Sequence, residues 1–165
     1  MAISRQKKEE ILKNASEVFN DSLTTVFVHF SGLDANTTNE MRSEMNKESV
    51  KFTVAKKTLI KMAAQNAKVD GEIPEFGDGE IGFVYSFEDQ MAPARLVKEF
   101  AKKTDGKIEI IGGIFDGQFK TKEEMQSIAD IPSLDTLRGM FVNIINSPIQ
   151  RTVVALGQIA EKKEA

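Results

Sequence analysis

The stretch Thr24-Thr25-Val26-Phe27-Val28-His29-Phe30 gives the clearest indication of the fold, because β-branched and aromatic side chains fill it from end to end. Such residues favour a buried strand. Ser31-Gly32 follows, and the glycine permits a tight turn there. Upstream, apolar residues recur at helical spacing from Ile11 to Phe19. They predict a helix that Ser4 caps and that breaks at residues 20–22.

Helices and strands alternate downstream of this stretch. Further strands are predicted at residues 50–54, 81–85 and 107–115, the last with a bulge at Gly112-Gly113. Helices are predicted at residues 37–47, 56–64, 92–103 and 121–130, with caps at Thr37, at Ser86 and Asp89, and at Thr121. Residues 70–80, rich in glycine, proline and acids, form a loop. This order predicts an α/β fold: a small sheet with packed helices.

The pattern changes after Pro132. Ser133 begins a helical run without another strand, and its apolar residues recur three or four positions apart. They are Leu134, Leu137, Phe141, Ile144, Ile145, Ile149, Val153, Leu156 and Ile159. Pro148 should kink this run or restart it as a second helix. The chain is therefore predicted to divide into an α/β head, residues 1–132, and an extended C-terminal amphipathic segment, residues 133–165.

The apolar stripe of the C-terminal segment has two interpretations. It can fold back onto the head, or it can bind partner helices in a groove or bundle. A membrane surface fits less well, because the polar face is not markedly basic. An eleven-residue repeat, from Val142, Ile145 and Ile149 to Val153, Leu156 and Ala160, is a weak hint of two binding sites.

Composition argues against an enzyme. The chain has no cysteine, and its single histidine, His29, lies mid-strand without companions for a metal site or a triad. Gly77-x-Gly79 precedes a strand, whereas a phosphate-binding loop joins a strand to a helix. No apolar run is long enough to span a bilayer, and the N-terminus is charged at once. We expect a cytoplasmic protein with no catalytic residue, metal or cofactor.

Charge is spread unevenly. The net charge is −3, but the residues up to Met62 include ten bases and eight acids, so this third carries +2 and the remainder −5. Lys56-Lys57-x-x-x-Lys61 stands where the second strand passes into a helix, and helix starts favour phosphate. An ordinary solvated basic face is the alternative. The chain lacks tryptophan and has few aromatic residues, so contacts to RNA backbone and shape are expected in preference to base stacking.

Six stretches resemble a known family in their order and spacing. They are VFVHFSGL (26–33), VAKKTLIKMA (54–63), ARLVKEFAK (94–102), GGIFDG (112–117), IADIPS (128–133) and SPI (147–149). Over nearly its whole length the chain resembles bacterial large-subunit ribosomal protein ten, which anchors the ribosomal stalk. The resemblance implies a structural protein with a ferredoxin-like head that binds large-subunit rRNA beside a neighbouring ribosomal protein at the stalk base. It also implies a C-terminal helix that holds dimers of the acidic stalk protein, which recruit translational GTPases.

The resemblance assigns most residues of both surfaces; Lys51 is added because it points outward on the strand before Lys56, and Ile145 because it belongs to the apolar stripe. Those expected to face rRNA are Arg5, Lys7, Lys8, Ser31, Gly32, Leu33, Arg42, Lys51, Lys56, Lys57, Thr58 and Lys61. Those expected to bind stalk dimers are Ile145, Ile149, Val153, Leu156 and Ile159. The family usually has arginine where this chain has Ser31, so a charged phosphate contact is missing there. It commonly has arginine-asparagine at Lys56-Lys57, and lysine lacks the bidentate geometry of arginine.

Two other function classes remain as alternatives. A ribosome-assembly factor would share the head but lack the stalk-binding tail, so the apolar C-terminal segment argues against it. A small α/β enzyme would need a convergent polar cluster, and the sequence contains no recognisable one.

Overall fold

The computed structural model describes residues 5–67, 69–71, 73–74, 76–77, 79–104 and 106–164. The chain forms two compact units, Met1–Ile131 and Pro132–Ala165. The helices of the first unit are α1 (Arg5–Asp21), α2 (Ala35–Lys47), α3 (Lys57–Asn66), α4 (Ala92–Lys103) and α5 (Lys122–Ala129). Its strands are β1 (Thr24–Phe30), β2 (Val50–Val54), β3 (Glu80–Ser86), β4 (Ile108–Phe115) and β5 (Gln118–Lys120). The second unit contains α6 (Leu134–Glu164).

The strands form one antiparallel sheet in the order β2-β3-β1-β4-β5. The predicted strand β1 lies at its centre, between β3 and β4, and its first five residues are buried. Helices α2 and α4 connect β1 to β2 and β3 to β4, which gives the split βαβ arrangement of ferredoxin-like folds. The predicted α/β class is therefore confirmed. Strand β5 was not predicted, because its three residues follow the Asp116-Gly117 turn with no alternating pattern long enough to detect.

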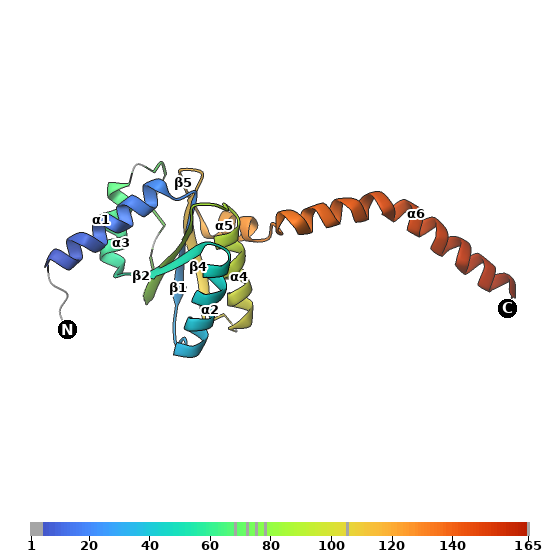
Figure 1. Ribbon diagram of the computed structural model, residues 1–165, viewed down its shortest axis with the longest axis horizontal. Coiled ribbons are helices and arrows are strands. Elements are labelled where there is room, and N and C mark those ends of the chain that lie inside the picture. Colours follow the sequence, from blue (N-terminus) through green and yellow to red (C-terminus); the bar gives the residue numbers. More distant parts are fainter. Residues whose placement is uncertain are drawn as a thin grey trace. The chain divides into compact units, whose positions relative to one another are not determined.

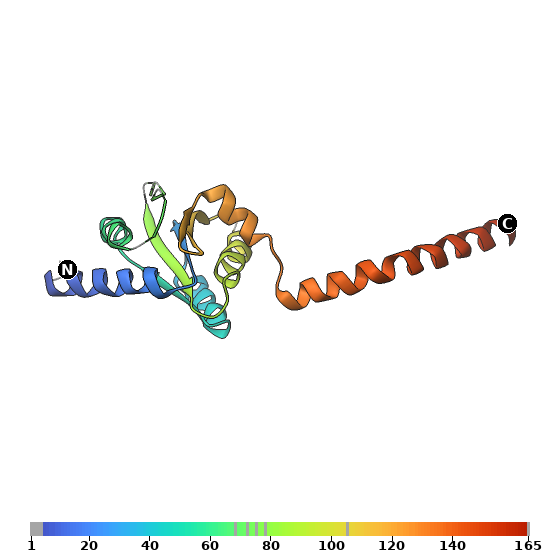
Figure 2. The same cartoon turned by 90° about the horizontal axis from the view of Figure 1, so that it is seen from above.

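Helices cover both faces of the sheet (Figures 1 and 2). Helices α2, α4 and α5 lie on one face over a core that includes Val26, Met45 and Val97. On the other face α1 packs against α3 over a second core that includes Phe19 and Ile60. The alternation of β1 explains the two cores, because Val26 and Phe27 point to opposite faces.

The predicted starts of helices are partly right. Thr121 and Glu124 form the expected capping box at α5. The cap predicted at Thr37 is wrong: α2 begins at Ala35, and the Thr38 hydroxyl donates to the Asp34 carbonyl instead. Ser86 and Asp89 do not cap α4, although its bounds are as predicted.

The Ser86 and Asp89 side chains instead shape the turn that precedes α4. The Ser86 hydroxyl accepts from the backbone N–H groups of Glu88 and Asp89, and the Asp89 carboxylate accepts from that of Met91. Capping patterns therefore identified the polar residues of this turn, but their side chains hold the turn and do not cap the helix.

Smaller predictions shift by a residue or two. Helix α1 continues through Asp21, and the predicted cap Ser4 lies outside the described residues. The bulge in β4 falls at Ile111, because Phe27 is opposite Gly112 and Val28 is opposite Ile110. Gly32 has a φ of +61°, as the predicted tight turn requires.

Helix α6 is continuous through Pro148, so of the two predicted outcomes, a kink or a restart as a second helix, the restart is wrong. Its axis changes direction partway along in Figure 1, as expected where proline removes a backbone hydrogen bond and its ring crowds the preceding turn. The Thr152 hydroxyl donates to the Pro148 carbonyl at 2.7 Å, so one backbone acceptor at the bend gains a side-chain donor.

Candidate nucleic-acid interface and partner-binding helix

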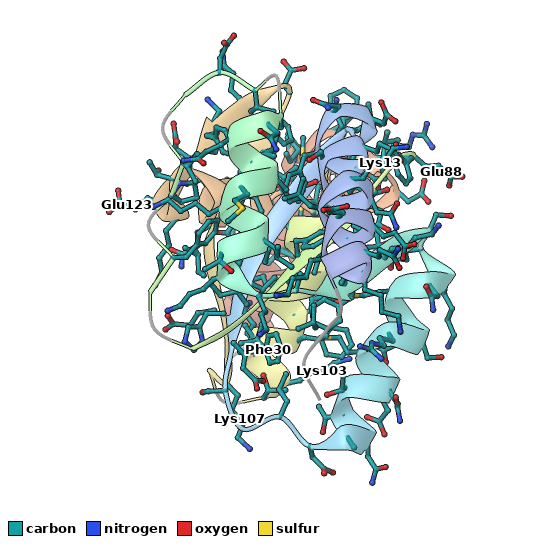
Figure 3. The ribbon with its side chains drawn as sticks, turned by 90° about the vertical axis from the view of Figure 1, so that its left-hand side faces the viewer. Lys13, Phe30, Glu88, Lys103, Lys107 and Glu123 are labelled. Atoms are coloured by element: carbon teal, nitrogen blue, oxygen red, sulfur yellow. The ribbon has the colours of Figure 1, made fainter. Side chains whose placement is uncertain are left out.

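An open hollow of about 670 Å³ lies where β1 and β2 end and β3 begins. We call it the strand-end pocket. Both helical layers reach it, because α2 contributes Thr38 and Arg42 while α1 contributes Ile11. The start of α3 completes the rim. Figure 3 looks onto α1 and α3 and shows Phe30 at the end of the sheet below them.

The floor of the strand-end pocket is aromatic. The Phe30 and Phe52 rings meet edge to face, with centroids 5.9 Å apart and an interplanar angle of 71°. Strand β3 runs between their two strands, and its Gly82 leaves room for the Phe52 ring: a Cβ there would lie 2.5 Å from Phe52 Cε2. The Arg42 guanidinium stands 5.7 Å from the Phe52 centroid, within cation–π distance.

The rim of the pocket is basic and rich in backbone donors. Lys56 is the N-cap of α3, and no acid stands in the first turn of that helix. Its carbonyl accepts from the N–H groups of Leu59 and Ile60, while the first N–H groups of a helix point outward. The Lys57 ammonium donates to the Gly77 carbonyl at 3.3 Å and thereby connects α3 to the loop before β3.

The structure brings together five of the residues predicted to face RNA: Leu33, Arg42, Lys56, Lys57 and Thr58 line the strand-end pocket. Ser31 and Gly32 are exposed immediately before Leu33, and Lys61 is exposed one turn beyond Lys57. Lys7 and Lys8 are exposed on α1, a few residues before Ile11. The side chain of Arg5 lies outside the described part of the chain.

Lys51 is the exception among the described candidates. It is exposed on β2 beside Phe52, and neighbouring residues of a strand point to opposite faces of the sheet. Lys51 therefore lies on the opposite face of β2 from Phe52, and it is not among the residues that line the pocket.

Sequence reasoning missed the aromatic floor. Phe30 and Phe52 were interpreted only as strand residues, although each stands at or near the end of a strand that passes into the candidate basic region. The chain-wide aromatic count hid this local concentration. Glu80, at the start of β3, was also missed, and it is the one acidic residue among the described lining residues.

The apolar side chains of α6 are exposed. All twelve large hydrophobic residues from Leu134 to Ile159 belong to the sixteen such residues that are exposed in the described chain. The five predicted partner residues, Ile145, Ile149, Val153, Leu156 and Ile159, are 54–64% exposed. The exposed surface also extends upstream of them, through Leu134, Leu137 and Phe141.

The described residues hold neither a membrane-spanning helix nor a cluster of metal ligands. None of their helices has the length and apolar character to cross a bilayer. In the same residues no three side chains of the metal-binding types gather in one place.

Known proteins match both units of the chain. The family model for ribosomal protein L10 matches residues 3–102, and the model for the ribosomal protein uL10 C-terminal region matches residues 131–165. The large ribosomal subunit protein uL10 of Bacillus licheniformis is 30% identical over 164 residues, which cover 99% of this chain and 98% of that protein. That of Staphylococcus aureus strain Newman is 30% identical over 96% of this chain and 95% of its own. The chain therefore belongs to the ribosomal protein L10 family of the large ribosomal subunit, a structural family without enzymatic activity.

Proposed function

We propose that the chain forms the base of the ribosomal stalk in the cytoplasmic ribosome. The head binds large-subunit rRNA beside a neighbouring ribosomal protein, with the rim of the strand-end pocket as its phosphate-binding edge. Helix α6 holds dimers of the acidic stalk protein, which support the recruitment of translational GTPases. The family resemblance supplies these partners, and the exposed residues described above supply the surfaces that suit them.

The convergence of Arg42, Lys56 and Lys57 around the start of α3 carries the RNA half of the proposal. Cations and outward backbone N–H groups at a helix start both attract phosphate. The acidic net charge of the chain is no obstacle, because the first third, which supplies most of the pocket, is positive. Contacts to phosphate release counterions, so the proposal makes binding dependent on salt.

A charge-matched pair of variants tests the RNA half. Lys56→Gln, Lys57→Gln and Lys61→Gln together should weaken binding to a large-subunit rRNA fragment. They should also lower the slope of log K against log salt by about one for each phosphate that is no longer neutralised. The control neutralises Lys102, Lys103 and Lys122, on α4 and α5, with the same change of net charge. If the control variant lowers affinity and slope as much as the pocket variant does, the RNA does not bind specifically at the rim of the pocket.

The exposed apolar surface of α6 carries the other half. Water-exposed hydrophobic side chains along one helix are unusual unless a partner covers them. Helix-in-groove or bundle packing would bury this surface without any charge match. The same surface favours the stalk role over that of an assembly factor lacking the tail.

A second matched pair tests the tail. Val153→Asp with Leu156→Asp should abolish co-purification of stalk-protein dimers and leave rRNA affinity unchanged. Gln150→Asp with Gln158→Asp adds the same charge to the same exposed helix and should keep the dimers. Deleting residues 148–165 should also abolish capture. Dimer capture by the deleted chain would reject this role for the tail.

A further inference from the structure

The strand-end pocket combines features that a phosphate-binding edge alone does not need. Its floor is apolar and aromatic, and its volume of about 670 Å³ lies in the range of about 300–1,000 Å³ typical of pockets for small ligands. Phosphate groups bind to cations and N–H donors at a surface and gain nothing from the Phe30 and Phe52 rings. The floor therefore calls for an occupant with a flat, uncharged face.

We propose that the strand-end pocket receives one unstacked nucleobase of the bound rRNA. This inference rests on the proposed rRNA binding and specifies how it occurs. The base would stack on the Phe52 ring, and its own phosphate would lie toward Lys56 and the start of α3. Bases that are splayed out of folded RNA commonly stack on aromatic side chains and arginine planes. The pocket supplies both, because the Arg42 guanidinium stands 5.7 Å from the Phe52 centroid.

The charged residues around the pocket match the two parts of a nucleotide, its anionic phosphate and its hydrogen-bonding base. The basic residues Arg42, Lys56 and Lys57 suit a phosphate. Glu80 would repel a phosphate, but its carboxylate can accept a hydrogen bond from the exocyclic amino group of a base. A purely phosphate-binding surface would gain nothing from that acid, whereas a base pocket can use it.

A base in this pocket departs from what composition predicts. A modest aromatic content and the absence of tryptophan predict contacts to the backbone and shape of RNA only. Two phenylalanines at one end of the sheet suffice for one base, whatever the content of the whole chain. Stacking on an aromatic side chain contributes about 5- to 150-fold in affinity per base.

Ultraviolet crosslinking of the intact chain on its rRNA fragment tests the proposal without a mutation. Trypsin cleaves after Lys51 and Lys56, so Phe52 lies in the short peptide of residues 52–56. We expect mass spectrometry to find this peptide joined to a single nucleotide, with Phe52 as the attachment point. Crosslinks confined to other peptides, with none in residues 52–56, would overturn the proposal.

A matched pair of variants gives a second readout. Phe52→Leu keeps an apolar side chain but removes the ring, so affinity should fall about 5- to 150-fold while the salt slope stays unchanged. Phe87→Leu makes the same change at an exposed ring outside the pocket and should bind as the parent does. Thermal unfolding of each variant verifies that it is folded. If Phe52→Leu does not fold, the crosslinking experiment on the unmutated chain still tests the proposal.

The outcomes separate this inference from the proposed function. If the lysine variants weaken binding but Phe52→Leu does not, the pocket holds no base and rRNA binding stands. If neither set changes affinity or slope, both proposals fail. An apolar side chain of a neighbouring ribosomal protein in the pocket would give no nucleotide on residues 52–56 and would also overturn the inference.

Discussion

The Arg42 guanidinium lies 5.7 Å from the centre of the Phe52 ring and links α2 to the edge strand β2. The same ring meets Phe30 edge to face, so an arginine, an edge strand and the central strand share one contact cluster. The Arg42 side chain is exposed to solvent, but the attraction of its guanidinium to the face of the Phe52 ring favours a conformation in which it lines the pocket. If the pocket receives the proposed base, this contact already holds the guanidinium beside the ring on which the base would stack.

Replacement of Arg42 should separate its charge from its shape. Arg42→Lys keeps the charge but loses the planar fork and its stacking, so rRNA affinity should fall a few-fold, in line with about 0.5–1 kcal/mol for an exposed cation–π contact, at unchanged salt slope. Arg42→Ala should weaken binding further and lower the slope. Affinities measured at several salt concentrations check this. A lysine variant that binds as tightly as the parent would show that the guanidinium geometry is unimportant.

Gly82 should resist substitution because of Phe52. The Cβ of Gly82→Ala would lie 2.5 Å from Phe52 Cε2 and 3.2 Å from the Thr53 carbonyl, so the ring must move. Overpacking of this kind costs about 1–3 kcal/mol, measurable by urea unfolding. Gly77→Ala, where a Cβ meets nothing within 4 Å, is the control and should stay within about 0.5 kcal/mol. Equal stability of the two variants would mean that the ring yields without cost.

The capping box of α5 should make stability depend on pH. The Thr121 backbone N–H and hydroxyl donate to the Glu124 carboxylate and, with Lys120, lower the pKa of Glu124 below its ordinary value. A pKa lowered by folding stabilises the folded state above the ordinary value, and this contribution is lost as pH falls through the lowered value. The stability advantage of the parent over Glu124→Gln should therefore be constant near neutrality and shrink in acid.

Urea unfolding of both proteins from about pH 7 to about pH 3 measures that difference across the range in which a carboxyl group titrates. Thr121→Ala removes the hydroxyl donor, so the same comparison in its background should show a weaker dependence on pH. If the difference in free energy of unfolding between the parent and Glu124→Gln does not change over this range, the capping box is not a source of pH-dependent stability.

Pro148 should limit the helicity of the tail. Proline in a helix interior is about 3 kcal/mol less favourable than alanine, so Pro148→Ala should raise the helical signal in circular dichroism and its resistance to heating. Pro132→Ala, before the first residue of α6, is the control and should leave the signal unchanged. If Pro148→Ala does not raise helicity, the turns around the bend are already fully stable.

The features that depend on local chemistry were predictable from the sequence. The central strand follows from the β-branched and aromatic run at Thr24–Phe30, and the Thr121 and Glu124 box follows from capping geometry. Both depend on residues a few positions apart. Strand β5 could not be predicted, because three residues carry no period and their pairing with β4 is tertiary.

Only the part of the candidate site that is formed by residues close together in the sequence could be predicted. Lys56, Lys57 and Thr58 are adjacent in sequence at a helix start, so their shared location could be inferred. Phe30 and Phe52 come together only through β3, a strand that the chain reaches much later. Lys51 was grouped with the basic residues by proximity in sequence, and the alternation of β2 places it on the other face.

Native mass spectrometry of the intact chain with an rRNA fragment and the acidic stalk protein would show whether separate parts of one chain carry the two partners. We expect one assembly that holds RNA and stalk dimers together. Val153→Asp with Leu156→Asp should remove the dimers alone, and the Lys56, Lys57 and Lys61 neutralisation should remove the RNA alone. Loss of RNA on mutation of the tail, or of dimers on mutation of the pocket rim, would contradict the assignment of the two partners to separate parts of the chain.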